Sequence, residues 1–533
     1  MRRPNARSVN PTLENDKEMD PTKLRFRPHR PGFRSPNIKY THPRSRYVFY
    51  SSIFVALVLS CYLLFSGRKN QETERFGVVI DGGSTGTRIY VFKYEVRKGT
   101  MVLDFSEKGL VSMKVNPGLS AYVEEPEGAG APVAELVEFA KRHVPKEQWR
   151  EADIWLMATA GMRLLKTEDQ ERILNVCRRV LRKSGFQFKD DGASVISGSD
   201  EGLYAWVVAN YALGTLGDHP AQTTGIIELG GASVQLTFAT DEPTPLEFSR
   251  KVSFGNFTYN LYSHSFLQFG QNVAFELLKE SLVSGGQGMA TEFLQTGKPM
   301  DPCTPRGYTH DEEAWKLSPS SVIEKNRYLS TLLPNGNFSG CRSASLELLQ
   351  KGRGSKFMPK LQGKFLATEN FFHTSKFFGL RERAFLSDLM VSGQEYCGEN
   401  WSKLKQKYPS LEEEELLRYC FSSAYIIALL HDNLGISLHD MRIAYANQVE
   451  NVPLDWALGA FILLNSSKLD MQHSNWIASI IGGDSSALML LFSIFFMLIL
   501  VTWIISKLRK PEVKTIYDLE KGKYIITRVG RYS

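Results

Sequence analysis

Two short acidic segments rich in glycine, 147 positions apart, have the residue types that a metal–phosphate site needs. They are Asp81–Ser84, which reads Asp-Gly-Gly-Ser, and Glu228–Gly231, which reads Glu-Leu-Gly-Gly. Glycine lets backbone N–H groups approach an anion, and the hydroxyls that follow add donors. Because a carboxylate repels a phosphate, the two acids fit this chemistry only if a divalent cation lies between them. The pair predicts a metal–nucleotide complex in a cleft, although either segment alone is equally compatible with an ordinary glycine turn.

Apolar strands are expected on both sides of each turn. Val78–Asp81 and Ile89–Tyr94 flank the first turn, and Val234–Phe238 follows the second. Such short connections predict two tight β-hairpins. Between residues 75 and 198, strands alternate with amphipathic helices, which predicts an α/β lobe. The further elements expected there are a strand at Ile154–Ala158 and helices at Val133–Val144 and Glu168–Arg182.

Eight blocks of this sequence resemble the ecto-apyrases, the nucleoside triphosphate diphosphohydrolases of the actin, hexokinase and heat-shock chaperone superfamily. The blocks stand in the family's order, cover roughly residues 75 to 470, and favour the membrane-anchored plant type. They are Asp81–Arg88, Ala158–Arg163, Ser199–Tyr211, Glu228–Gln235, Tyr259–Phe266, Pro302–Tyr308, Tyr419–Ser422 and Asp455–Gly459.

The resemblance implies an α/β fold of two actin-like (ribonuclease H-like) lobes around a nucleotide cleft. Lobe I is expected at 75–198 and lobe II at 199–441. The segment 442–470, with Trp456, is expected to return to lobe I.

The resemblance also implies the roles of the site residues. Glu201, at the start of a predicted helix Glu201–Leu213, is the expected general base, and Ser233 and Gln235 are expected to hold the attacking water. A helix N-terminus favours the ionised carboxylate, but a first-turn acid without a catalytic role fits the sequence alone equally well. The expected phosphate-binding residues are Gly83, Ser84, Thr85, Gly86, Thr87, Arg88, Thr159, Gly230, Gly231 and Ala232.

A divalent cation, Ca²⁺ or Mg²⁺, is the expected cofactor. Asp81 and Glu228 would hold it largely through water molecules, since hard cations prefer oxygen ligands. Glu228 stands where most relatives carry Asp. Arg163 is expected either to brace the cleft or to belong to an ordinary strand-to-helix loop.

Base recognition is less specified by the sequence. Relatives hold the base between aromatic rings with an arginine nearby, and Phe371, Phe372 and Tyr425 occur in suitable regions. Aromatic residues at such spacing are more often core residues. Gln271 stands where relatives often have the arginine, so the preferred base and the choice between tri- and diphosphates stay open.

Two uncharged apolar runs, 47–66 and 487–506, are long enough to cross a bilayer. The formal charge of +7 is concentrated outside them: residues 1–46 carry 12 Lys and Arg against 4 Asp and Glu, and residues 507–533 carry 8 against 3. The positive-inside rule therefore places both tails in the cytosol and the part between the spans in the lumen or outside the cell. The excess of basic residues therefore indicates orientation in the membrane and does not indicate a nucleic-acid-binding surface.

Glycosylation and cysteine usage agree with this topology. The four sequons, at Asn256, Asn337, Asn400 and Asn465, all lie between the two spans. Cys61 and Cys177 are expected to be free thiols, whereas the family resemblance implies disulfides Cys303–Cys341 and Cys397–Cys420. Gln268 replaces a cysteine that cell-surface relatives often carry, so a Golgi membrane is favoured over the plasma membrane.

The sequence therefore predicts a membrane-anchored, metal-dependent apyrase that releases phosphate from nucleoside tri- or diphosphates. A small-metabolite kinase on the same fold is an alternative enzyme, although the block around Glu201 and Gln235 favours water as the acceptor. A nucleotide-binding membrane scaffold without catalysis is the alternative outside the enzymes, and the intact acidic and polar residues oppose it.

Overall fold

The computed structural model describes residue 54 and residues 74–97, 100–284, 299–309, 332–353, 360–466, 496–501 and 513–528. All of these except residue 54 belong to one compact unit, Glu72–Ser533. No helix in this described part is long and apolar enough to cross a membrane. Apart from residues 54 and 496–501, the predicted spans 47–66 and 487–506 lie outside it, as do the tail 1–46 and Cys61.

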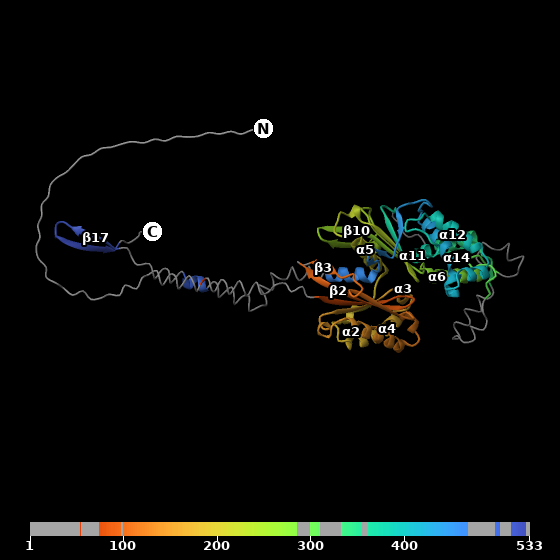
Figure 1. Ribbon diagram of the computed structural model, residues 1–533, viewed down its shortest axis with the longest axis horizontal. Helices are drawn as coiled ribbons and strands as arrows, with labels where there is room; N and C mark the ends of the chain where they lie inside the picture. Colours follow the sequence, from red (N-terminus) through yellow and green to blue (C-terminus); the bar gives the residue numbers. More distant parts are fainter. Residues whose placement is uncertain are drawn as a thin grey trace, which may run out of the picture. The chain divides into compact units, whose positions relative to one another are not determined.

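The first lobe contains a mixed sheet in the order β3-β2-β1-β5-β6, with β4 paired to β2. Strand β1 runs antiparallel to β2 and parallel to β5, so the first predicted hairpin is confirmed. Helices α2 and α4 pack on one face of this sheet (Figure 1). The elements are β1 (Arg75–Gly82), β2 (Thr87–Arg97), β3 (Thr100–Leu103), β4 (Leu110–Val115), α2 (Gly130–His143), β5 (Asp153–Ala158), α3 (Ala160–Arg163), α4 (Thr167–Arg182) and β6 (Ala193–Val195).

The second lobe contains another six-stranded sheet, in the order β14-β13-β7-β8-β10-β9. Strands β7 and β8 form the second predicted hairpin. Its strands are β7 (Gly225–Leu229), β8 (Ser233–Ala239), β9 (Ser249–Phe254), β10 (Phe257–Leu267), β13 (Phe365–Glu369) and β14 (Ile443–Tyr445). Strand β14 lies in the segment expected to return to lobe I, so the chain leaves the second lobe later than residue 441.

A layer of helices lies beside the second sheet and packs against one of its faces (Figure 1). They are α6 (Gln271–Val283), α10 (Phe338–Arg353), α11 (Asn370–Phe377), α12 (Leu386–Gly398), α13 (Trp401–Lys407) and α14 (Glu413–Ile427), the last continuing as the π-helical turn η7 (Ala428–Asn433). The short strand pairs are β11 (Met300–Asp301) with β12 (Leu333–Pro334), β15 (Gln448–Val449) with β16 (Val452–Pro453), and β17 (Val513–Asp518) with β18 (Lys523–Arg528).

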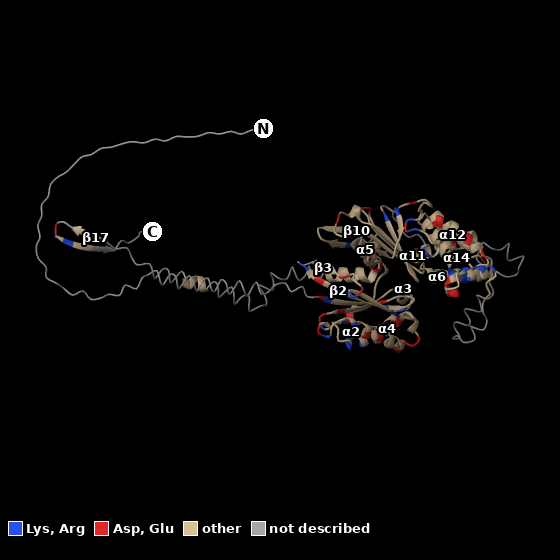
Figure 2. Cartoon of the chain, viewed as in Figure 1, with Lys and Arg blue, Asp and Glu red and all other residues tan. Residues whose placement is uncertain are grey.

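Both expected disulfides form in this helical layer. Cys303 bonds to Cys341 and Cys397 bonds to Cys420, and all four residues are fully buried. The first ties the loop after β11 to α10, and the second ties α12 to α14. Cys177, in contrast, is a free buried thiol on α4, as its position on the apolar face predicted. Figure 2 shows charges of both signs on the outer faces of α2 and α4, where they meet water.

One apolar cluster joins the two lobes. It contains Phe92 from the first sheet, Tyr259 from the second, Trp206 from α5 (Gly198–Ala212) and Phe461 from the helical residues 456–466. The two helices touch through their backbones, because a Cβ on Gly459 would lie 1.9 Å from the carbonyl oxygen of Tyr204. Helix α5 and the returning helix therefore form a shared layer that fixes the two sheets, and the loops at their ends, relative to each other.

Candidate active site

The two glycine-rich turns face each other from opposite lobes. A Cβ on Gly231 would lie 2.7 Å from Ser84 Oγ and 3.3 Å from Thr85 Cγ2. Only a residue without a side chain permits so close an approach. A cavity of about 150 Å³ lies between the turns, and residues of both lobes line it.

Most of the expected phosphate-binding residues border this cavity. Gly83, Ser84, Thr85, Gly86 and Arg88 line it from the first hairpin, Thr159 from the start of α3, and Gly230, Gly231 and Ala232 from the second hairpin. Thr87 is the exception. Its side chain is 1% exposed and it pairs with Gly82 and Val115 inside the sheet, so it supports the turn instead of facing the cavity.

Glu201, Ser233 and Gln235 come together as expected, and Arg163 joins them. The Glu201 Oε2 atom accepts hydrogen bonds from Arg163 Nη2 at 2.8 Å and from Gln235 Nε2 at 3.0 Å. Ser233 Oγ accepts from the same two donors, at 3.2 Å from Arg163 and 2.6 Å from Gln235. The four side chains thus form one polar cluster beside the phosphate turns.

Local structure explains how Glu201 reaches this place. Ser197 caps α5, where its hydroxyl accepts a hydrogen bond from the Asp200 backbone N–H at 3.1 Å. Glu201 follows in the first turn, where the helix dipole favours negative charge. Ser233 and Gln235 lie two residues apart on β8, so both point to the same face of that strand.

The environment of Glu201 balances two opposing effects. Burial raises the pKa of its carboxyl group, while the ion pair with Arg163 and the hydrogen bond from Gln235 lower it. Arg163 therefore braces the cleft through a direct contact, and the alternative of an ordinary loop residue is not supported. It is itself anchored by a hydrogen bond from Nη1 to the carbonyl oxygen of Ile196 at 3.3 Å.

The half-buried Asp81 and the buried Glu228 lie on opposite sides of the cavity, at the ends of β1 and β7. Asp81 Oδ1 and Glu228 Oε2 are buried without any hydrogen-bond partner. Burial raises the pKa of both carboxyl groups well above the ordinary values, and the negative charge of neighbouring acids, including Glu201 and Asp455, raises them further. Uncompensated carboxylates of this kind call for a cation.

The donor set fits a hydrated divalent cation. Carboxylate oxygens are the ligands that Ca²⁺ and Mg²⁺ prefer, and Mg²⁺ in particular keeps several water ligands. Among the described residues, no group of three or more His, Cys, Asp or Glu side chains is placed to hold a metal ion directly. Two opposed carboxylates with water in the remaining positions agree with both observations.

Sequence reasoning gave no role to Asp455, which lines the cavity together with the expected Arg88. Arg88 Nη1 donates to Tyr90 Oη at 3.0 Å, and Tyr90 Oη donates to Asp455 Oδ2. Asp455 in turn accepts the Ala457 backbone N–H at 2.9 Å, at the start of the returning helix. Asp455 stands in one of the eight blocks that carry the resemblance, so that block held a signal for it.

Glu369 and Lys114 also line the cavity and were missed. Glu369 ends β13, and Lys114 lies in β4. Nothing in the spacing of either residue distinguishes it from the other charged residues at the ends of strands, and no motif marks them.

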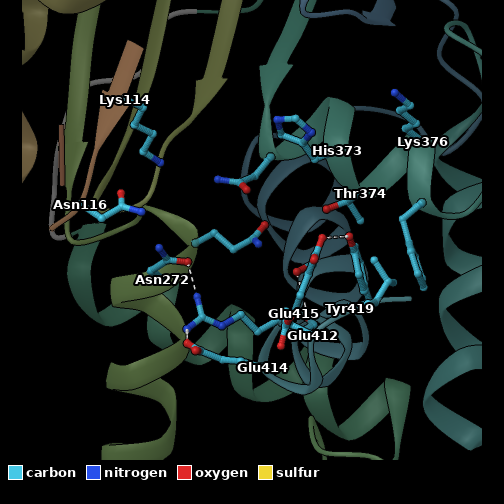
Figure 3. A pocket seen from close by; sticks show the side chains of 16 residues that line it. Lys114, Asn116, Asn272, His373, Thr374, Lys376, Glu412, Glu414, Glu415 and Tyr419 are labelled. Carbon is cyan, nitrogen blue, oxygen red and sulfur yellow. Dashed lines mark hydrogen bonds and ion pairs between the residues drawn. The ribbon is translucent and has the colours of Figure 1, made fainter. Parts of the chain in front are cut away.

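Figure 3 shows a second cavity, of about 1000 Å³. Lys114 lines this cavity and the first one, so the two adjoin. Gln271, Asn272 and residues of α11 and α14 also line the second cavity. Arg418 Nη1 donates to Asn272 Oδ1 at 2.6 Å, and Arg418 also pairs with Glu414. Tyr419 borders the cavity and stacks on Phe377 with ring centroids 3.5 Å apart.

The three aromatic residues considered as base-binding candidates do not line this cavity. Phe371 is 1% exposed and Tyr425 is fully buried, with its hydroxyl donating to the Phe269 carbonyl oxygen at 2.6 Å. Both are core residues of the second lobe. Phe372 is half-buried beside Lys376, also outside the cavity lining. Gln271 does line the cavity, as its position predicted.

The model of the GDA1/CD39 (nucleoside phosphatase) family matches residues 68–475. The chain therefore belongs to this family of apyrase-type enzymes, as the eight blocks predicted. Among its relatives, "Probable apyrase 6" of Arabidopsis thaliana is 50% identical over 99% of this chain and 100% of that protein. "Ectonucleoside triphosphate diphosphohydrolase 5" of Ailuropoda melanoleuca is 32% identical over 75% of this chain and 89% of that protein.

The fold agrees with a solved relative. The crystal structure of nucleoside triphosphate hydrolases from Neospora caninum superposes with a TM-score of 0.56 at 17% sequence identity, covering 78% of this chain and 98% of that one. At this identity, the match concerns the fold alone.

The ion pair between Arg163 and Glu201 predicts a pH effect. Because Arg163 lowers the pKa of Glu201, its replacement in Arg163→Met should raise that pKa and move the acidic limb of the kcat/KM profile of phosphate release to higher pH. The rate at the optimum should fall about tenfold or more, since a hydrogen bond to a buried charge is lost. Arg179→Met, which removes an exposed ion pair with Glu127, is the control and should change neither quantity. An unshifted acidic limb in folded Arg163→Met would show that this limb does not report the titration of Glu201.

Proposed function

We propose that this chain is a divalent-metal-dependent apyrase that hydrolyses the terminal phosphates of nucleoside tri- and diphosphates. The observation that carries the proposal is the cluster of Glu201, Arg163, Ser233 and Gln235 beside two opposed phosphate-binding turns. The family membership and the printed names of the relatives support the same reaction.

In this proposal Glu201 is the general base. Its carboxylate accepts a proton from the attacking water, and Ser233 and Gln235 orient that water because a hydroxyl and an amide can both donate and accept. Arg163 keeps the carboxylate ionised and in place through the 2.8 Å ion pair. Backbone N–H groups of the turns at Gly83–Gly86 and Gly231–Ala232 stabilise the charge on the transferred phosphoryl group, whereas the Gly230 N–H donates to the Ser233 carbonyl oxygen at 3.0 Å and closes the hairpin.

Asp81 and Glu228 would hold the hydrated Ca²⁺ or Mg²⁺ of the substrate complex. Their buried oxygen atoms without partners support this assignment. The cation would supply neutralisation of the phosphate charge. The chain itself supplies the opposed carboxylates, the turns and the base.

The nucleoside would occupy the cavity of about 1000 Å³ that adjoins the phosphate cavity. Its lining offers amide groups from Gln271, Asn272 and Asn370, which can donate to and accept from a base edge. A polar lining of this kind suits a nucleoside better than an apolar metabolite.

We further propose that spans 47–66 and 487–506 anchor the enzyme in a Golgi membrane, with both tails in the cytosol and the catalytic unit in the lumen. Two disulfides in the second lobe support an oxidising compartment. Of the four sequons, Asn256, Asn337 and Asn400 are exposed and accessible to glycosylation. Asn465 is 5% exposed and its amide donates to the Phe461 carbonyl oxygen, so the folded chain does not offer this amide.

The role of Glu201 predicts a separation of binding from turnover. Glu201→Gln should fold and bind nucleotide, but release phosphate at least about 10²-fold more slowly, as expected when a general base is lost. Phosphate release and binding of a fluorescent nucleotide analogue measure the two quantities. Glu171→Gln, at an exposed ion pair on α4, is the matched control. Near-native turnover of Glu201→Gln would remove this residue from the mechanism.

Glu228 provides the test of the metal cleft. Glu228→Asp should keep metal-dependent activity with a changed preference between Ca²⁺ and Mg²⁺, whereas Glu228→Ala should lose most of it, because the cation is no longer positioned from the second lobe. Titrations of phosphate release with each cation measure this. If both variants fold and give the wild-type titration, the proposal that Asp81 and Glu228 hold the cation is wrong.

The topology makes a separate prediction. In sealed microsomes, tags at both termini should be digested by added protease, while the unit between the spans survives and loses mass on treatment with a glycosidase. Variants at Asn256, Asn337 and Asn400 should each lose one glycan, and Asn465→Gln should leave the mass unchanged. Protection of either tag would show that the orientation is wrong.

A further inference from the structure

Glu369 has a backbone conformation that is unusual for its residue type. It ends β13 with φ 58° and ψ −120°, directly before α11 begins at Asn370. Positive φ is the region that favours glycine, and a residue with a side chain persists there only when its surroundings hold it. Such conformations concentrate at functional sites, so the side chain at this position needs an explanation.

Three hydrogen bonds hold the chain around Glu369. Its backbone N–H donates to Asn447 Oδ1 at 2.7 Å. The neighbouring Asn370 Nδ2 donates to the Leu229 carbonyl oxygen at 2.8 Å, and Ala446 N donates to the Ala367 carbonyl oxygen at 3.2 Å. This framework ties the end of β13 to the second phosphate turn and directs the Glu369 side chain to the wall of the phosphate cavity.

Glu369 lies where the two cavities meet. It lines the phosphate cavity, whereas the next residues on α11, Asn370, His373 and Thr374, line the larger one. Lys114 borders both cavities, and Figure 3 shows its side chain on the side of the larger cavity opposite α11. A nucleotide with its phosphates in the first cavity and its base in the second must carry its ribose past Glu369 and Lys114.

The chemistry of a carboxylate at this junction restricts its partner. A phosphate is excluded by charge, and Asp81 and Glu228 already supply opposed carboxylates for a cation. A ribose, in contrast, offers two adjacent hydroxyl donors, and an ionised carboxylate can accept both. Arg88 and Lys114 favour the ionised form, because their positive charges lower the pKa that burial and Asp455 raise.

We propose that Glu369 accepts hydrogen bonds from the 2′- and 3′-hydroxyls of the substrate ribose and so positions the nucleoside for cleavage. The proposal rests on the nucleotide hydrolysis proposed above and goes beyond it by assigning a sugar-recognition residue. Glu369 does not take part in the chemical step, so the loss of its carboxylate should raise KM and leave kcat unchanged.

The experiment compares three ligands with the full-length enzyme. They are the ribonucleoside triphosphate that the wild type hydrolyses fastest, its 2′,3′-dideoxy counterpart, and inorganic tripolyphosphate, measured as a substrate or as a competitive inhibitor. We expect the wild-type KM to be about tenfold higher for the dideoxy nucleotide, as for the loss of charge-assisted hydrogen bonds. In Glu369→Gln, whose amide keeps one uncharged acceptor oxygen, the ribonucleotide KM should rise towards the dideoxy value. The kcat, the dideoxy KM, the tripolyphosphate constant and the midpoint of the Ca²⁺ titration should stay unchanged.

Glu450→Gln is the matched control, because Glu450 is also a glutamate at positive φ, 52°, but is exposed and outside both cavities. It should leave every constant at the wild-type value. If Glu369→Gln does not fold, Glu369→Gly removes the carboxylate and accepts the positive φ.

Two outcomes overturn the assignment and leave nucleotide hydrolysis intact. One is an equal wild-type KM for ribo- and dideoxynucleotide, which needs no variant at all. The other is a change in tripolyphosphate binding or in the Ca²⁺ midpoint of Glu369→Gln, which would make Glu369 part of the cation site. A wild type that hydrolyses no nucleotide overturns the proposed function, and this assignment with it.

Discussion

The burial of like charges around one small cavity is the constraint on which the rest of this structure depends. Asp81, Glu201, Glu228 and Asp455 converge there from four separate segments, and burial raises the pKa of each carboxyl group. An isolated cluster of this kind would cost several kcal/mol for each ionised group. Glu201 is offset by an arginine, and Asp455 by a tyrosine hydroxyl and a backbone N–H. Asp81 Oδ1 and Glu228 Oε2 have no hydrogen-bond partner, and the proposed cation would offset their charge.

This arrangement requires rigid support, because opposed carboxylates repel each other and would otherwise move apart. The support is the apolar layer of α5 and the returning helix 456–466 between the two sheets. Both helices begin at the cavity, one with Glu201 in its first turn and the other directly after Asp455. The same packing that buries Trp206 and Phe461 therefore positions two of the acids. Hydrophobic burial at the centre of the molecule stabilises the electrostatically unfavourable site at its edge.

The sequence specified local features better than long-range ones. Both hairpins and α5 could be predicted, since each depends on a short segment with a distinct pattern. The grouping of Glu201 with Ser233 and Gln235 joins separate segments and was expected only from the family resemblance. Glu369 could not, because its positive φ occurs without the Gly or Asn that usually signals it. Phe371 and Tyr425 could only be weighed as base-binding candidates against the more common core role, since an aromatic residue in sequence looks the same in both places, and the structure shows that both belong to the core. Strand β14 extends the second sheet through a pairing that only the tertiary fold reveals.

The near contact of Gly231 with Ser84 and Thr85 has a consequence for how the two halves of this enzyme can vary. A methyl group at position 231 would require the side chains of Ser84 and Thr85 on the opposite turn to move, and both of these residues line the phosphate cavity. Substitutions on one side of the cleft are therefore not independent of substitutions on the other, although the two positions lie in different lobes. When one turn is replaced by that of a distant relative, the turn that faces it in the other lobe therefore has to be replaced as well.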